Sequence, residues 1–300
     1  MKIVRPRVTM LSLSALATKD GTFDGETNAE EWLEPQPGSS RAEYLTEFAG
    51  RSCYQSFNRP NPATAETKDY IKRTLFDQGH WSIAEHASVT FYLEGVSRAF
   101  THELIRHRHL SYSQLSQRFV DGSDIEVVLP PALELYYSNH EGTTTAFDNA
   151  VEAAQKAYKE LASVLLEDGY TRKQAREAAR SVLPNATETK IVVTGNLRAW
   201  SEFCNRRMQP DADAEMQVVA GMIYEKLRAC APNIFPQREE ETTHSRESEL
   251  DDLAEGSAVT VAERLFVKHN GGWEHSLSKQ VLASWELADL GEYELLYKGR

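Results

Sequence analysis

The sequence has few cysteines, and none of them stands in a pattern that binds metal or builds a disulfide framework. Cys53, Cys204 and Cys230 are odd in number, widely spaced and outside any C-x-x-C pair, which is typical of a protein kept in a reducing compartment. The sequence also lacks an apolar run of membrane length and a secretory signal segment. We therefore expect a soluble cytoplasmic protein without membrane contact.

Positive charge is also scarce, and several common catalytic motifs are absent. The net charge of -12 argues against a general nucleic-acid binder. The sequence contains no G-x-G-x-x-G, no G-x-S-x-G and no H-E-x-x-H, which disfavours a Rossmann dinucleotide site, a hydrolase nucleophile elbow and a zinc-protease site. The 300 residues are 41% apolar, which is enough for a sizeable core.

Against this acidic background stands one basic stretch, Arg106–Arg118, which reads RHRHLSYSQLSQR. Its cations Arg106, Arg108 and Arg118 are all arginine, the residue suited to bidentate contacts with phosphate or carboxylate. Three serines add hydroxyl groups, and Gln114 adds an amide that can bind a heterocycle edge. The stretch therefore favours a site for a small anionic ligand such as a nucleotide, although a solvated basic helix end has a similar composition.

Five of the nine histidines fall within thirty residues, which raises the question of a metal site. They are His80, His86, His102, His107 and His109. No cysteine ligand lies nearby, no short His/Asp spacing recurs, and arginines flank His107 on both sides. A divalent cation would be repelled there, so we expect no metal.

Periodicity and capping residues predict alternating helices and strands. The expected helices cover residues 41–54, 64–78, 98–108, 145–168, 171–182, 197–207 and 212–230, and the expected strands 1–11, 87–93, 125–129 and 190–194. We expect Gly95 to end a strand and Gly195-Asn196 to form a turn. The helix over 98–108 would place Glu103, Arg106 and His107 on one face, with the basic stretch continuing as a loop.

Composition divides the chain into three parts. Residues 1–236 form the main domain, in which 17–40 reads as a polar loop or insertion. Residues 237–256 read as an acidic linker, because 238–256 hold eight acidic and two basic side chains. Residues 257–300 regain apolar content and could form two helices around Asn270-Gly271-Gly272, with no recognisable chemistry.

The R-H-R triplet at 106–108, followed by Ser116 and Arg118, resembles the signature of flavin-dependent thymidylate synthases. Residues 80–86, HWSIAEH, resemble the upstream H-x-[ST]-x-x-E-H segment of that family. Residues 180–184 and 194–207 resemble its C-terminal half, so the similarity runs in consistent order over roughly residues 41–235.

The resemblance implies an α/β (α+β) fold with a mixed sheet flanked by long helices, in an intertwined homotetramer with active sites at subunit interfaces. It implies reductive methylation of dUMP with FAD as cofactor and with NADPH and 5,10-methylenetetrahydrofolate as co-substrates. The FAD contacts it implies are Ser82, Arg106, His107, Arg108, Gln114, Asn196, Leu197, Arg198 and Glu202. The dUMP contacts it implies are Glu103, Leu104, Ile105, Arg106, Gln114, Leu115, Ser116, Gln117, Arg118, Arg180 and Arg207.

The resemblance gives Arg207 the catalytic role. No Pro-Cys-His segment is present to supply a nucleophilic cysteine, so a cation must stabilise the enolate-like form of the uracil ring. Arg207 could also be an ordinary cation at a helix C-terminus. Glu202 and Asp211 depart from the family pattern, and Glu202 would equally suit a ladder with Arg198 and Arg206 at i, i+4 spacing.

Two functions from other classes stay open at this point. A non-catalytic nucleotide- or RNA-binding protein would use the arginines and Tyr112 of the basic stretch, although the acidic net charge disfavours it. A metal-dependent nucleotide hydrolase would need the histidines as ligands.

Overall fold

The computed structural model describes residues 2–14, 33, 36–134, 141–238, 258–261, 264–269 and 272–275. For residues 141–144 and for the last three segments we describe the backbone alone. Most of the predicted loop 17–40 and of the predicted linker 237–256 lies outside the described residues. None of the described helices is both long and apolar enough to cross a membrane.

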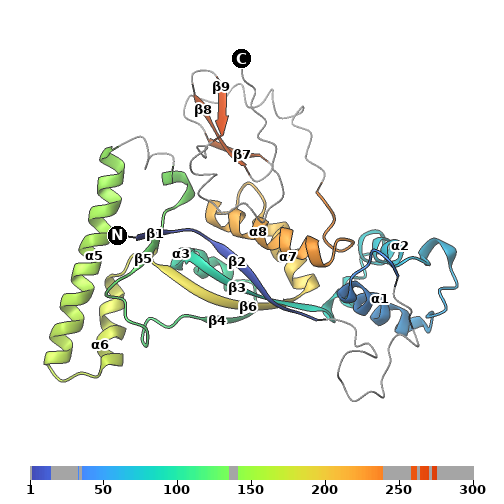
Figure 1. Ribbon diagram of the computed structural model, residues 1–300, viewed down its shortest axis with the longest axis horizontal. Helices are drawn as coiled ribbons and strands as arrows, with labels where there is room; N and C mark the ends of the chain where they lie inside the picture. The colour runs from blue at the N-terminus through green and yellow to red at the C-terminus, as the bar shows by residue number, and fades with distance from the viewer. Residues whose placement is uncertain are drawn as a thin grey trace.

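A four-stranded antiparallel sheet with the strand order β2–β3–β6–β4 forms the centre of the structure (Figure 1). Its strands are β2 (Arg7–Leu13), β3 (Ser88–Ser97), β6 (Glu188–Asn196) and β4 (Ser111–Gln114). A second sheet pairs β1 (Lys2–Val4) in parallel with β5 (Glu126–Val128). The single mixed sheet that we expected is thus divided into an antiparallel sheet and a parallel pair.

The single strand expected over residues 1–11 is two strands, because Pro6 separates β1 from β2. Proline has no N–H to donate to a ladder. The segment between β1 and β2 passes close to Gly95. This glycine lies inside β3 at a register shift rather than ending the strand as we expected. Gly95 has a φ of +64°, and a Cβ there would lie 1.9 Å from the carbonyl oxygen of Arg5. The chain can pass over β3 only where the side chain is missing.

The helices agree closely with the periodicity. They are α1 (Arg41–Tyr54), α2 (Thr67–Ile71) continued by a π-helical segment (Lys72–Asp77), α3 (Arg98–Leu104), α5 (Glu141–Glu167), α6 (Arg172–Ala179), α7 (Leu197–Arg207) and α8 (Ala214–Cys230). Short 3₁₀ turns cover Pro62–Thr64, Trp81–Glu85 and Arg180–Val182. The predicted bounds of α1 and α7 are confirmed, and Ser40 caps α1 in a capping box.

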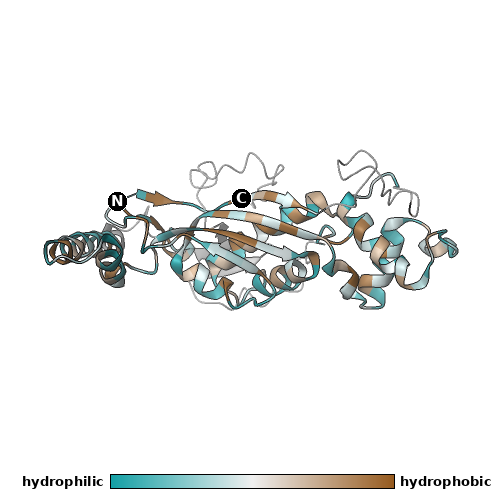
Figure 2. Cartoon of the chain, turned by 90° about the horizontal axis from the view of Figure 1, so that it is seen from below, coloured by the Kyte–Doolittle hydropathy of each residue, from teal (hydrophilic) through white to brown (hydrophobic). Residues whose placement is uncertain are grey.

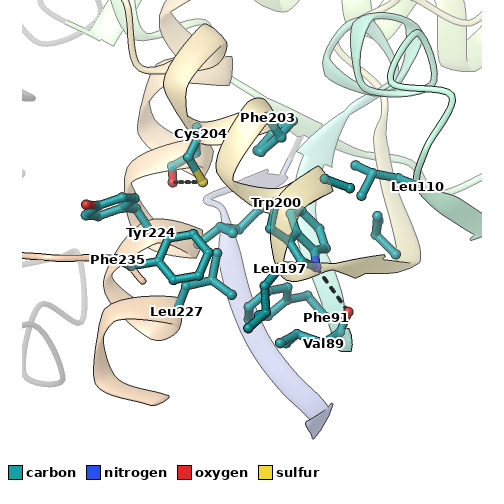
Figure 3. Packing of buried hydrophobic residues seen from close by; sticks show 14 of the residues in the cluster. Val89, Phe91, Leu110, Leu197, Trp200, Phe203, Cys204, Tyr224, Leu227 and Phe235 are labelled. Carbon is teal, nitrogen blue, oxygen red and sulfur yellow. Dashed lines mark hydrogen bonds between the residues drawn. The ribbon is translucent and has the colours of Figure 1, made fainter. Parts of the chain in front are cut away.

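The main core lies between the sheet and helices α7 and α8 (Figure 3). Burial alternates along β3 and β6, so that Val89, Phe91 and Val193 are on the buried face. Trp200 of α7 is completely buried, packs edge-on against Phe91 at 5.1 Å, and donates from Nε1 to the carbonyl oxygen of Val89 at 3.1 Å. This packing fixes α7 on the sheet, and with it the position of Arg207 at the end of α7.

The described chain is elongated: α5 and α6 lie at one end of the sheet, and α1 and α2 at the other (Figure 2). Val151 and Tyr158 of α5 are buried, whereas Leu161, Val164 and Leu166 near its C-terminal end are exposed. One chain therefore leaves apolar surface uncovered at that end.

Three further expectations about local structure differ from the structure. The helix expected over 98–108 ends at Leu104, and the loop expected after it covers only residues 105–110, because strand β4 then begins at Ser111. Gly195 and Asn196 belong to strand β6 instead of a turn. The two helices expected in 257–300 are replaced, where that region is described, by a three-stranded antiparallel sheet, β7 (Ala258–Val261), β8 (Arg264–His269) and β9 (Gly272–His275).

Candidate active site

Arg207 lies at the C-terminal end of α7 and binds two residues of the neighbouring basic region. Its Nε donates a 2.9 Å hydrogen bond to Nε2 of His107, and its Nη1 lies 2.8 Å from the Glu103 carboxylate. The side chain is 21% exposed. These partners come from α3 and the turn after it, so Arg207 does more than cap the carbonyls of its own helix.

His107 is neutral over the physiological pH range. Burial lowers its pKa to about 4, and the cations Arg207 and Arg206 add to this effect, while Glu202 opposes it. The edge of the imidazole also packs against Phe203, with 5.0 Å between ring centroids. A neutral imidazole has one acceptor nitrogen, and Arg207 occupies it here.

The turn that carries Arg106, His107 and Arg108 is fixed at both ends. The Tyr112 hydroxyl lies 2.7 Å from the carbonyl oxygens of Leu104 and His107, which also accept the backbone N–H groups of His107 and Leu110 respectively. Leu110 packs into space that exists only because residue 195 is glycine: a Cβ on Gly195 would lie 2.2 Å from Cδ2 of Leu110. The sheet therefore holds this turn against α7.

An open pocket of about 450 Å³ lies where α7 meets this turn. Its lining residues are Arg106, His107, Asn205, Arg206, Arg207, Gln209 and Asp211. Three of them are arginines and one is acidic, so the pocket attracts anions. No cysteine lines it, and the described residues contain no group of His, Cys, Asp or Glu side chains placed to hold a metal ion.

A second cationic cluster lies at the other end of α3: Arg98 and Arg180 lie near each other, and Arg118 is paired with Glu177, three residues before Arg180 in the chain. Arg98 begins α3, and its pKa is lowered by burial and by the charge of Arg180 nearby. Nε of Arg118 lies 2.8 Å from the Glu177 carboxylate, but this buried N–H is not aligned for a hydrogen bond. Arg98 and Arg180 are neighbouring cations, and such a pair favours an anionic ligand between its two side chains.

The remaining predicted dUMP contacts follow the chain from α3 to the second cluster. Gln114 is fixed by hydrogen bonds from its Nε2 to Thr101 Oγ1 at 3.0 Å and Thr189 Oγ1 at 3.3 Å. Ser116 begins the turn that follows β4 and accepts from the N–H of Phe119. Ile105 is exposed and Leu115 and Gln117 are half-buried, whereas Leu104 is wholly buried and offers a ligand only its backbone.

The predicted FAD contacts lie in three places. Arg106 and Arg108 are exposed and form no ion pair within the described residues, and Ser82 is exposed on the 3₁₀ turn before β3. Arg198 is 2.6 Å from Glu85 and 3.4 Å from Glu202, so the first half of the predicted i, i+4 ladder is present.

Two other residues in this set have structural roles. The Asn196 side chain caps α7 by accepting from the N–H of Ala199, and Leu197 is buried in the core.

Sequence reasoning missed Arg98 and the pocket residues Asn205, Arg206 and Gln209. Arg98 carries a signal that could have been used, because neither Thr101 nor His102 gives it an acidic partner one helical turn away. An arginine at the start of a helix with no acidic partner on that helix is a candidate contact for an anionic ligand.

The chain is similar to known proteins over most of its length. The profile of a family described as thymidylate synthase complementing protein matches residues 38–233. A flavin-dependent thymidylate synthase from Mycolicibacterium gilvum is 46% identical over 239 residues, covering 77% of this chain and 88% of the relative. One from Mycobacterium tuberculosis is 49% identical over 226 residues, covering 73% and 84%.

A solved structure has a similar fold. The UMP/dUMP methylase PolB from Streptomyces cacaoi, bound with 5-Br dUMP, superposes with a TM-score of 0.58 at 22% identity, over 78% of this chain and 95% of that chain.

Proposed function

Because the chain belongs to the flavin-dependent thymidylate synthase family, we propose that it methylates dUMP to dTMP in the pocket beside Arg207. The one-carbon donor is 5,10-methylenetetrahydrofolate, and NADPH is the source of electrons. The observation that carries this proposal is the half-buried cation at the pocket wall: Arg207 is held by Glu103 and His107 and lines a cationic pocket with no cysteine.

Arg207 activates the pyrimidine by its charge. C5 of uracil is a weak nucleophile, and electron density reaches it when the ring takes an enolate-like form with negative charge on a carbonyl oxygen. A pre-positioned guanidinium stabilises that charge without reorganising. A cysteine adduct has no support here, because Cys204 is buried in the core, burial raises the pKa of Cys230 to about 11, and Cys53 lies on the distant helix α1.

The residues present fit FAD. Its pyrophosphate is an anion, and Arg106 and Arg108 are exposed guanidinium groups without a carboxylate partner among the described residues. Ser82, His107 and Arg198 are further predicted FAD contacts with polar side chains. FAD, once reduced by NADPH, supplies the electrons of the methylation.

The phosphate of dUMP belongs at the second cluster. Ser116, Arg118 and Arg180 are the predicted contacts, and Arg98 joins them through its proximity to Arg180. A phosphate dianion between these side chains would compensate the repulsion that lowers the pKa of Arg98. In this proposal Glu177 is the counter-ion that Arg118 exchanges for phosphate.

We propose that each complete site combines residues from more than one chain. The two clusters lie at opposite ends of α3, about 10 Å apart by helical rise, and the pocket beside Arg207 includes no residue of the second cluster. Thr101 and Leu104 between them are buried in the same chain. We therefore place each active site between subunits of a homotetramer, which would also cover exposed apolar residues of α5.

The test is spectroscopic and chemical. Purified protein reconstituted with FAD should show flavin absorption that bleaches with NADPH when dUMP is bound, and should form dTMP when methylenetetrahydrofolate is added. Arg207→Ala should abolish dTMP formation while leaving the fold and the flavin absorption.

Arg228→Ala is the matched control, because Arg228 is also an ion-paired arginine in the last turn of a helix. It should leave turnover unchanged. A protein that neither retains nor regains FAD, or an Arg207→Ala variant with normal turnover, contradicts the proposal.

A further inference from the structure

His107 uses one of its ring nitrogens to hold Arg207. Nε2 accepts a hydrogen bond from the Arg207 Nε–H at 2.9 Å, so the proton of the neutral ring must be on Nδ1. A protonated imidazole would have a donor on both nitrogens and would lose this contact.

The charges around His107 keep it in the acceptor form. Arg206 and Arg207 approach from α7 together with Glu202, Glu103 lies on the other side of Arg207, and Arg106 and Arg108 flank His107 in the chain. Cations outnumber carboxylates in this group, so a proton on the ring would be repelled. The packing of Phe203 against the ring further limits its rotation.

His107 and Glu103 together fix Arg207 from two directions. Glu103 contacts Nη1 and His107 contacts Nε, and the guanidinium is planar, so two such contacts determine its plane. An arginine held by Glu103 alone could rotate about that ion pair. The backbone of His107 is also held in place, because the Tyr112 hydroxyl donates to its carbonyl oxygen.

We propose that His107 is a positioning residue for Arg207: its neutral imidazole, acting as a hydrogen-bond acceptor, orients the guanidinium that faces dUMP. This inference rests on the proposed function. His107 would then have two roles: the expected contact with the flavin, and a second role that it exerts through Arg207.

Affinity for dUMP, measured by calorimetry at saturating FAD, tests this role, because loss of flavin then cannot imitate loss of positioning. His107→Leu removes the acceptor and should weaken dUMP binding by roughly tenfold to a hundredfold, the effect of a lost hydrogen bond to a charged group. His107→Gln retains an acceptor oxygen and should recover most of that loss. His102→Leu, on the exposed side of α3, is the matched control and should bind as the wild type does.

A double-mutant cycle with Arg207→Lys separates the two roles of His107. Lysine keeps the positive charge but has no Nε–H, so His107→Leu should cost little further affinity in that background.

Equal losses in both backgrounds, or no recovery with His107→Gln, would show that His107 acts independently of Arg207 and would overturn the inference alone. Wild-type protein that binds FAD but no dUMP would overturn the proposed function and the inference with it.

Discussion

A single hydroxyl group connects the core of the sheet with the turn that carries the arginines. Tyr112 lies on β4, and its hydroxyl is 2.7 Å from the carbonyl oxygens of Leu104 and His107. Burial raises the pKa of Tyr112 to about 12, so the hydroxyl keeps its proton and remains a donor throughout the neutral range. Each of these two oxygens also accepts a backbone N–H, so the hydroxyl adds a second contact that joins β4 to the turn.

Tyr112→Phe should therefore destabilise the fold by about 1–2 kcal/mol and also weaken dUMP binding. Denaturant unfolding and calorimetry measure the two effects. Tyr92→Phe is the control, because Tyr92 is in the same sheet and its hydroxyl has no hydrogen-bond partner in the described part of the chain. Normal dUMP binding by Tyr112→Phe would mean that the turn keeps its shape without this contact.

Most individual site residues were predicted from one local motif. The R-H-R triplet and Ser116 stand within eleven residues, so one stretch of sequence contained most of the candidate site. The contact between His107 and Arg207 joins positions 100 residues apart, and the proximity of Arg98 to Arg180 depends on how α3 meets the turn after α6. Neither is visible before the chain has folded.

At the scale of elements, the junction between β3 and α3 is held by a carboxylate from α8. Glu215 accepts from the N–H of Ser97 at 2.7 Å and from its hydroxyl at 2.5 Å, while the Ser97 hydroxyl oxygen caps α3 by accepting from Phe100. Glu215 is buried, and burial raises its pKa above the ordinary value. This junction sets the direction of α3, and so the separation of the two arginine clusters.

The pH dependence of stability should report this junction. A carboxyl whose pKa is raised by folding binds its proton more tightly in the folded state, so its contribution is fully present below the unfolded pKa and is lost as pH rises through the folded pKa. The advantage in melting temperature of wild type over Glu215→Gln should therefore shrink from pH 4 upward. Glu160→Gln, at an exposed position on α5, should show no such trend; a difference that grows with pH would contradict this account of Glu215.

Prediction of whole elements was most accurate where capping and periodicity agreed. Ser40 and the spacing of apolar residues located α1, but β4 was missed because its four residues are mostly polar. Strand β4 lies at the sheet edge, where pairing with β6 decides its conformation. In the tail, Asn270 and Gly271 separate β8 from β9 in the sequence, and an Asn-Gly pair favours a hairpin at least as strongly as a break between helices.

At the scale of the whole molecule, the two arginine clusters bear on the proposal that each active site is shared between chains. The cluster of Arg98, Arg118 and Arg180 lies at one end of α3, and the pocket beside Arg207 lies at the other. If dUMP bridges two chains, each active site takes Arg207 from one copy and Arg118 from another. Cyclic or dihedral symmetry then repeats this arrangement at every interface.

Mixing two inactive variants distinguishes shared sites from sites within one chain. Arg207→Ala and Arg118→Ala should each lose nearly all dTMP formation when purified alone. Co-expressed in equal amounts with different affinity tags, they should form mixed oligomers in which about a quarter of the sites combine an intact Arg207 with an intact Arg118. Those oligomers, isolated through both tags, should recover a comparable fraction of wild-type turnover. If both arginines serve the same site within one chain, no mixed oligomer contains an intact site, and turnover stays at the level of the separate variants.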